Sequence, residues 1–244
     1  MNDFIEEMID LKKISSNPLT GLKKYSKNPE NPRGVIDRDS LIKMFPSHHV
    51  DMVRIWGSTM WACLMLVFFD TGVRPGEARA LTWADIDIRK RFVPIHKGIE
   101  AGTVDKIKGT KTGVVKAGFL NRRTVQELDI WRMETKWNSG ADFVFTAKGK
   151  SPVTNEAVTK AFRRGLDQVE KENREWRSDP KWTPYWLRHS FGTYQMEVLE
   201  ESEISALMGT GAAVLKRHYQ HPDNETLYKS SEGIQKKLDK ARNL

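Results

Sequence analysis

The sequence predicts a mainly helical protein of the α+β class with one small antiparallel β-sheet. Apolar residues recur at helical spacing over most of the second half of the chain. Segments typical of strands are few and short, and they fall between residues 85 and 120. Hydrophobic residues make up 39% of the 244 residues, which is enough to form a core. The sequence contains no internal repeat and no low-complexity tract.

The first 36 residues are expected to lie outside the main domain. Residues 1–12 fit a short amphipathic helix, and residues 15–34 have the composition of a linker, with three prolines and a group of lysines. The main domain should begin near Asp37. The predicted organisation is therefore an extension and linker over 1–36, followed by one domain over 37–244.

The first part of the domain should contain a long buried helix and a rigid corner. A short helix at Leu41–Phe45 precedes an apolar run that predicts one helix from His49 to Asp70. Gly72 is suited to a left-handed cap at the end of that helix. Pro75 then stands where the first turn of a helix tolerates proline, and Glu77 lies near the positive helix start.

Strand-like segments follow this corner. Residues 85–89 and 92–96 have strand composition, and residues 104–107 and 114–120 flank the turn at Gly109–Gly113. The two flanking segments are expected to pair with each other around the turn. Because they are short and polar, the sheet should lie at the edge of the domain.

The rest of the domain should be helical. Asn121 can cap a helix over residues 124–137, and Asn155 can cap the next one. The apolar face of that second helix consists of Val158, Phe162, Leu166 and Val169. Four further helices are expected, at residues 184–199, 203–208, 212–218 and 224–241.

Composition favours a polyanionic partner inside a reducing compartment. The formal net charge is +8, and lysine and arginine contacts to phosphates release counterions. The single cysteine, Cys63, cannot form an internal disulfide and is expected to be buried. The acidic start lacks a signal-peptide pattern, and the apolar run at 61–69 is too short to span a bilayer. We therefore expect a cytoplasmic protein.

Four separated residues together suggest chemistry on a phosphodiester. Arg74, Lys111, Arg188 and Tyr219 supply two guanidiniums, an ammonium and a phenol. A phenol can attack phosphorus, two arginines can hold the phosphate oxygens, and a lysine can give a proton to the leaving oxygen. Arg188 is expected at the rim of an apolar face, where its guanidinium would be held in place. Each residue alone has a commoner explanation: a surface arginine, a hairpin lysine, a helix-capping or ion-paired arginine, or a packing tyrosine.

Taken in order, the segments that carry these residues resemble the tyrosine recombinases, the phage integrase family. Thr71–Asp87 resembles the family's first arginine box, and Thr110–Gly113 its catalytic lysine turn. Leu187–Thr193 resembles the second arginine box, and Leu207–His221 the closing tyrosine box. The resemblance spans roughly residues 37–221 and is specific only as an ordered set.

This resemblance implies a tyrosine recombinase catalytic domain that breaks and rejoins double-stranded DNA. By its analogy, Tyr219 forms a 3′-phosphotyrosyl link, Arg74 and Arg188 clamp the phosphate, and Lys111 protonates the leaving 5′ oxygen. Glu77 would orient neighbouring groups. No cofactor and no metal is expected, since the phosphotyrosyl ester conserves the bond energy. A bacterial, phage or mobile-element origin is implied.

The sequence departs from the family pattern at two supporting positions. Tyr185 stands where the family usually has a histidine, three residues before the second arginine. Thr210 stands where the family usually has a histidine or tryptophan, nine residues before the nucleophile. The Tyr185 hydroxyl can still donate to phosphate, whereas Thr210 is shorter. The family also usually carries an N-terminal DNA-binding domain, of which residues 1–36 resemble only the end.

Two other functions fit the same residues. One is a catalytically weakened or inactive DNA-binding remnant, favoured by Tyr185 and Thr210. The other is relaxation of DNA in the manner of a type IB topoisomerase. In either case we expect DNA-backbone contacts from five basic residues: Lys160, Arg163, Arg164, Arg122 and Arg123. The last helix is expected to mediate self-assembly on DNA, with a monomer in free solution.

Overall fold

The computed structural model describes residues 9–15, 35–100, 102–109, 115–195, 197–209, 236 and 239. The chain divides into two units, Met1–Arg33 and Gly34–Leu244. In the first unit, the backbone N–H of Lys12 donates to the carbonyl of Ile9 at 2.9 Å and closes a helical turn. The second unit contains the elements that bear on function.

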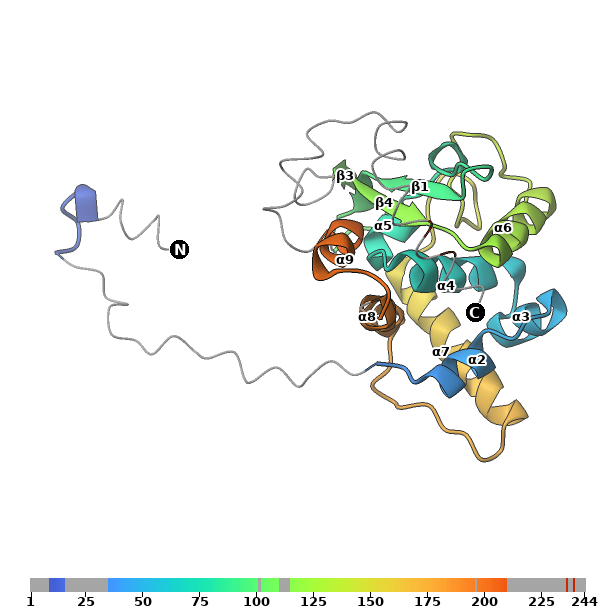
Figure 1. Cartoon of the computed structure of the whole chain (residues 1–244). Coiled ribbons are helices and arrows are strands. Elements are labelled where there is room, and N and C mark those ends of the chain that lie inside the picture. Colours follow the sequence, from blue (N-terminus) through green and yellow to red (C-terminus); the bar gives the residue numbers. More distant parts are fainter. Residues whose placement is uncertain are drawn as a thin grey trace. The chain divides into compact units, whose positions relative to one another are not determined.

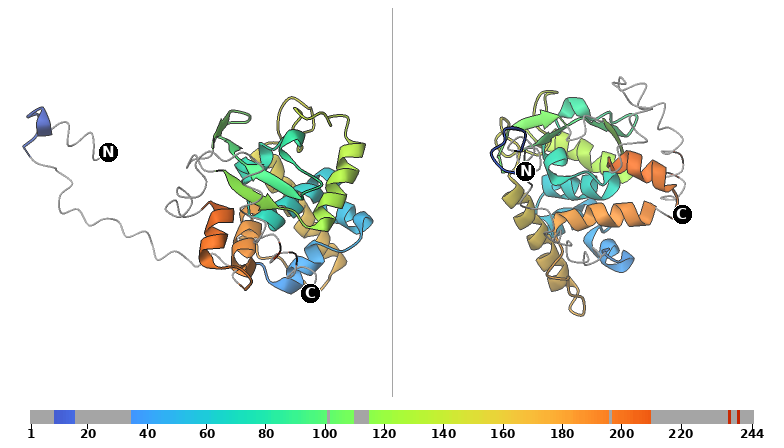
Figure 2. Two further views of the ribbon diagram at one scale, coloured as in Figure 1. Left: turned by 45° about the horizontal axis from the view of Figure 1, so that its top comes forward. Right: turned by 90° about the vertical axis from the view of Figure 1, so that its left-hand side faces the viewer.

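This second unit is mainly helical and carries two small antiparallel strand pairs, which confirms the predicted fold class (Figures 1 and 2). The helices are α2 (Arg38–Met44), α3 (His49–Trp56), α4 (Thr59–Thr71), α5 (Pro75–Arg79), α6 (Arg122–Glu134), α7 (Asn155–Glu172), α8 (Pro184–Gln195) and α9 (Glu201–Met208). The strands are β1 (Phe92–Ile95), β2 (Lys97–Ile99), β3 (Ile107–Gly109) and β4 (Lys116–Phe119).

Helix α4 forms the centre of the core. All of its side chains except Trp61 and Phe69 are buried, and it packs against α3, α6 and α8. Cys63 is buried in this helix, as predicted. Among the described residues, no single helix is long and apolar enough to cross a membrane; only the bent pair α3 and α4 passes that test by length and composition.

The predicted single helix from His49 to Asp70 is wrong, because the chain bends by 95° between α3 and α4. Gly57 adopts a left-handed conformation with φ of 83° and ends α3. Ser58 then caps α4 by accepting from the N–H of Trp61. The bend lets Trp56 pack on α7, where a Cβ at Gly165 would lie 2.4 Å from its ring.

The strands do not pair as predicted. β4 pairs with β1 and β3 pairs with β2, so the two segments that flank the turn after Gly109 each pair with an earlier strand. β1 and β4 are fully buried, whereas β3 is exposed. Of the two strand pairs, only β2–β3 matches the polar sheet that was predicted at the edge of the domain. The reason is a small apolar cluster in which Phe92 and Phe119 pack against α8 and α9.

Local caps explain two further differences. Residues 85–89 form no strand, because Asp85 closes a 3₁₀ turn by accepting from the N–H of Thr82 at 2.7 Å. Asn121 caps α6 as predicted, but the cap of α7 is Thr154, one residue before the predicted Asn155. The helix predicted at 212–218, and that at 224–241 apart from residues 236 and 239, lie outside the described residues.

Candidate phosphate-binding active site

The corner between α4 and α5 positions Arg74. Gly72 ends α4 in the predicted left-handed conformation, with φ of 59°. A Cβ at Gly72 would also lie 2.4 Å from the ring of Phe191, so this glycine allows α8 to pack on the corner. Arg74 is the N-cap of α5, and its backbone N–H donates to Glu77 at 2.9 Å. Its side chain remains 41% exposed.

Glu77 is a buried carboxylate shared by two cations. Its Oε1 accepts from Nζ of Lys116 at 2.5 Å and from Nη1 of Arg74 at 3.2 Å. The Lys116 side chain on β4 is only 3% exposed, in contrast to Arg74. Sequence reasoning did not single out Lys116. A signal was present, since a lysine in the apolar run Val114–Leu120 requires a buried partner.

Arg188 on α8 is the third cation of the site. It is 2% exposed, so it is buried and not at the rim of an apolar face as predicted. Its Nη1 donates to the carbonyl of Gly72, and its Nη2 donates to the carbonyl of Met208 at 2.8 Å. Burial lowers the pKa of Arg188, and a side-chain hydrogen bond to Tyr185 partly opposes this effect. These bonds hold the guanidinium between the α4–α5 corner and the end of α9.

The C-terminal end of α9 closes the site on the side of Lys116. Gly209 follows α9 with φ of 62°, and a Cβ there would lie 2.4 Å from Cδ of Lys116. The lysine stem therefore crosses the backbone of Gly209. Arg74, Lys116, Arg188 and Glu77, here called the Glu77 cluster, come from α5, β4 and α8, and the end of α9 contacts Lys116 and Arg188.

Burial and charge set the pKa values in the Glu77 cluster. Burial lowers the pKa of Lys116, Glu77 raises it, and Arg188 and Arg74 lower it, so that it falls to about 8. Burial raises the pKa of Glu77, but Lys116 and Arg74 outweigh this effect and the pKa is lowered. Burial and then Arg74 lower the pKa of Arg188. Among the described residues, the three cations thus outnumber the one carboxylate in the cluster, which favours binding of an anion.

Two glycines bring the β2–β3 hairpin against the start of α5. A Cβ at Gly76 would lie 2.9 Å from the carbonyl oxygen of Ile99, closer than real Cβ atoms approach. A Cβ at Gly98 would lie 3.5 Å from Cγ of Glu77, which is ordinary contact. Arg79 adds to this attachment, because its guanidinium donates to the carbonyl of Val104 in the hairpin loop at 2.8 Å.

Three predicted site residues, Lys111, Thr210 and Tyr219, lie outside the described residues. The ends of the segment that carries Lys111 are fixed, because Gly109 pairs with Lys97 and Lys116 pairs with Ile95. Thr210 directly follows Gly209.

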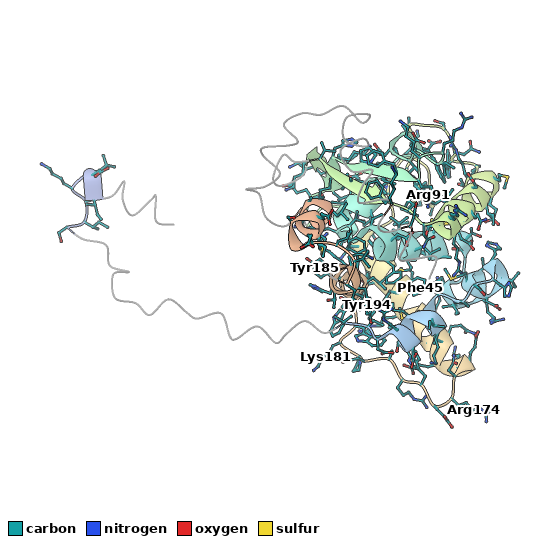
Figure 3. The ribbon with its side chains drawn as sticks, in the orientation of Figure 1. Phe45, Arg91, Arg174, Lys181, Tyr185 and Tyr194 are labelled. Atoms are coloured by element: carbon teal, nitrogen blue, oxygen red, sulfur yellow. The ribbon has the colours of Figure 1, made fainter. Side chains whose placement is uncertain are left out.

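Tyr185, the other supporting residue, lies in the first turn of α8, and Tyr194 lies in the last turn (both labelled in Figure 3). Its ring contacts that of His189 edge to face, with centroids 4.9 Å apart.

The five basic residues predicted to contact DNA fall into two groups. Arg163, Arg164 and Arg123 donate to backbone carbonyl groups, and the bond of Arg164 closes the end of α3 at 3.0 Å. These guanidiniums therefore have packing roles within the domain. Lys160 is exposed and forms an ion pair with its helix neighbour at 2.6 Å, and Arg122 is exposed at the start of α6.

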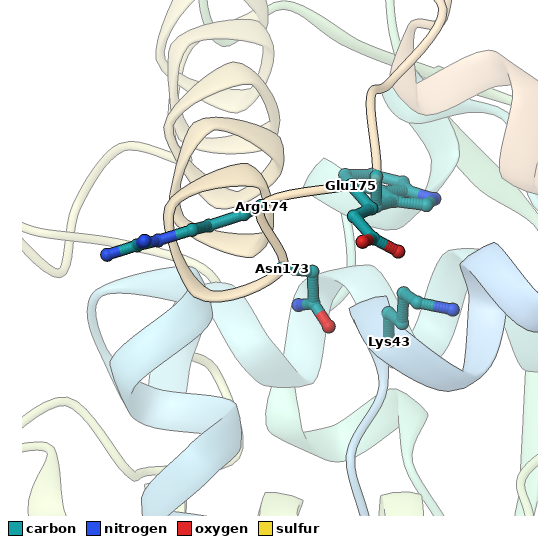
Figure 4. Close-up of a pocket in the computed structure, with 5 residues that line it drawn as sticks. Lys43, Asn173, Arg174 and Glu175 are labelled. Atoms are coloured by element: carbon teal, nitrogen blue, oxygen red, sulfur yellow. The ribbon is translucent and has the colours of Figure 1, made fainter.

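A cavity of about 520 Å³ lies away from the Glu77 cluster, between α2 and the end of α7, and is lined by Lys43, Asn173, Arg174, Glu175 and Trp176 (Figure 4). Within the described part of the chain, no group of three His, Cys, Asp or Glu residues is arranged to hold a metal ion.

The sequence model of the phage integrase family matches residues 54–225, well over half of the chain, including all of the Glu77 cluster. The chain belongs to the phage integrase family. It is therefore an integrase, an enzyme of site-specific DNA recombination of the tyrosine recombinase type. No curated protein sequence matches this integrase.

Solved structures show the same fold. The integrase is similar to the Tn1549 transposon integrase in complex with a circular intermediate DNA, with a TM-score of 0.66 and 18% identity over 93% of this chain and 74% of that chain. It is also similar to a lambda integrase tetramer bound to a Holliday junction, with a TM-score of 0.57 and 16% identity over 91% and 57% of the two chains. For the XerA recombinase, the TM-score is 0.53 and the identity 17%, over 82% and 65%.

Proposed function

We propose that the Glu77 cluster binds the scissile phosphate of double-stranded DNA and that Tyr219 attacks it. The observation that supports this proposal most strongly is the gathering of three cations around Glu77: Lys116 and Arg74 bond to it, and Arg188 lies within its electrostatic reach. Arg74 and Arg188 contact the two non-bridging oxygens. Fixed guanidiniums stabilise the charge that develops on these oxygens without reorganising during the reaction.

The cleavage step conserves the phosphodiester energy. Tyr219 loses its phenol proton to water, its oxygen forms a bond to phosphorus, and the bond between phosphorus and the 5′ oxygen breaks. Lys111 gives its proton to that oxygen, which leaves as a 5′-hydroxyl. The product is a 3′-phosphotyrosyl ester, and attack by a 5′-hydroxyl reverses the step and rejoins a strand. A free phenol has a pKa of about 10, and the nearby cations favour its ionised form.

Tyr185 and Thr210 complete the phosphate site in this proposal. The side-chain hydrogen bond between Tyr185 and Arg188 supports a position of the Tyr185 hydroxyl beside the two arginines that hold the phosphate. Its hydroxyl donates to a phosphate oxygen where the family usually uses an imidazole. Thr210 follows the glycine that packs on Lys116, and its hydroxyl supplies a second donor.

The test is formation of a covalent protein–DNA adduct on nicked suicide duplexes of pooled sequence, with supercoiled plasmid alongside. Wild type should form an adduct and Tyr219→Phe should not. Arg74→Ala and Arg188→Ala should slow adduct formation on the order of 10²- to 10³-fold, as when one fixed donor to a developing oxyanion is removed. An adduct that persists in Tyr219→Phe would assign the nucleophile to another residue. A folded wild type that binds DNA without forming any adduct would contradict the mechanism.

For DNA-backbone contacts, we propose Lys160 and Arg122, which are exposed. Arg164 is exposed as well, but its guanidinium donates to the carbonyl of Trp56. Lys160→Ala should weaken binding to all DNA sequences. It should also reduce the slope of log Kd against the logarithm of the salt concentration by about one, the value expected for the loss of one phosphate contact. The neighbouring Glu156→Ala variant, which removes the partner of Lys160, is the control and should not lower that slope. An unchanged slope in Lys160→Ala would exclude this lysine from the interface.

We further propose that the integrase is a cytoplasmic monomer in free solution and assembles on DNA. Asp239 contacts its own domain, because Nη1 of Arg91 donates to its carboxylate at 2.9 Å. On assembly, the C-terminal segment, residues 224–241, would dock on a neighbouring protomer. Light scattering with and without DNA tests this: a stable dimer without DNA, or a monomer on saturating DNA, would contradict it. We also retain residues 1–36 as an extension and 37–244 as the catalytic domain.

A further inference from the structure

Two cations compete for the same oxygen of Glu77. Lys116 lies 2.5 Å from Oε1, whereas Arg74 lies 3.2 Å from it. The ammonium is buried and the guanidinium is 41% exposed. Lys116 is therefore the main ionic partner of Glu77. Arg74 makes the longer contact and has further N–H groups that do not bond to Glu77.

The position of Lys116 is fixed from several sides. β4 holds its backbone opposite Ile95 of β1, and its stem crosses Gly209 at the end of α9. Its ammonium lies within the electrostatic reach of Arg188. Burial and the like charges of Arg188 and Arg74 make this a costly place for an ammonium, and the ion pair with Glu77 offsets that cost.

We propose that Lys116 is a positioning residue of the phosphate site: by occupying Glu77, it keeps the Arg74 guanidinium available to the scissile phosphate. Without Lys116, the buried carboxylate would have Arg74 as its remaining partner. A buried charge must be paired, so Arg74 would close onto Glu77 and leave the phosphate. The inference rests on the proposed role of Arg74.

A double-mutant cycle tests this role. The rate of adduct formation at saturating DNA is measured for wild type, Lys116→Met, Glu77→Gln and the double variant. Lys116→Met should slow the reaction on the order of 10- to 100-fold, because the clamp is misplaced. The double variant should be faster than Lys116→Met, because glutamine still accepts from the backbone of Arg74 but carries no charge to draw in its side chain. A double variant as slow as Lys116→Met, or slower, would overturn the proposal.

A substrate with sulfur at the 5′ bridging position separates positioning from proton donation. A thiol has a pKa near 8.5, so the thiolate leaves without a proton. Lys116→Met should remain slow on this substrate, whereas recovery to the wild-type rate would identify Lys116 as the general acid and overturn the positioning role. Lys111→Met should recover, as a positive control for the substrate.

Two further variants complete the design. Lys106→Met removes an exposed hairpin lysine that pairs with Glu100, and it should react at the wild-type rate. Arg74→Ala separates the two proposals. If it reacts as fast as wild type, the phosphate role of Arg74 fails. If it is slow while Lys116→Met is fast, only the positioning role fails. Circular dichroism and urea unfolding establish that each variant is folded.

Discussion

Raising the pH from 7 to 9.5 should stabilise the folded domain, because Lys116 then loses its proton in its buried site. Its pKa is about 8 in the fold, against an ordinary value of 10.5. Between these two values the unfolded chain binds more protons than the folded chain, so the free energy of unfolding rises with pH. Integrated over pH 7 to 9.5, the gain is about 2 kcal/mol. Below pH 7 the lysine is protonated in both states and contributes no slope.

The assay is urea unfolding at constant ionic strength, followed by tryptophan fluorescence, for wild type and Lys116→Met. The free energy of unfolding should rise by about 2 kcal/mol in wild type relative to the variant, which has no group to titrate at this position. Burial raises the pKa of the Cys63 thiol, and its ionisation in the unfolded chain lowers both curves alike. Lys106→Met, which removes a solvent-exposed lysine, should keep the wild-type rise. Parallel curves for wild type and Lys116→Met between pH 7 and 9.5 would refute the assignment of the low pKa to Lys116.

Three further substitutions test how the site is held in place. Gly76→Ala should slow adduct formation by roughly tenfold or more, because its Cβ would lie 2.9 Å from the carbonyl of Ile99 and displace the hairpin. Gly165→Ala should lower the free energy of unfolding by about 1–3 kcal/mol in urea titrations, because its Cβ would overlap the ring of Trp56. Arg79→Met should cost about 1–3 kcal/mol and speed hydrogen exchange of residues 102–109, because two carbonyls lose their donor.

Each of these predictions has a matched comparison. Gly98→Ala adds its Cβ at ordinary contact distance from Glu77 and should leave the adduct rate close to wild type. Gly140→Ala meets Ala84 at 3.6 Å and should change stability far less than Gly165→Ala. If residues 102–109 exchange at the wild-type rate in Arg79→Met, the loop is held by other contacts.

Local interactions account for the parts of the fold that the sequence predicted correctly. Gly72 ends its helix because a left-handed residue satisfies nearby carbonyls, and Asn121 starts its helix by accepting from an N–H three residues later. Both depend on a few consecutive residues. The break at Gly57 was missed because apolar residues continue through it, although the Gly57–Ser58 pair was a signal.

Long-range contacts account for the parts that the sequence did not predict. The strand pairing depends on which segments can bury Phe92 and Phe119 against α8 and α9, and this is a property of the assembled domain. Similarly, Arg164 and Arg123 seemed available for DNA on a helical surface, but their guanidiniums satisfy carbonyls at the ends of distant helices.

The sequence by itself determined the family and the chemical groups, because the ordered boxes around Arg74 and Arg188 keep their residue types at short spacing. It did not determine how the charges of the site are balanced. Only the tertiary structure placed Lys116 on Glu77, 39 residues away in the chain, and left Arg74 exposed beside them. Residue types are set locally, but the pairing of buried charges is decided by which strands and helices meet, since a charge removed from water is stabilised only by the groups that surround it.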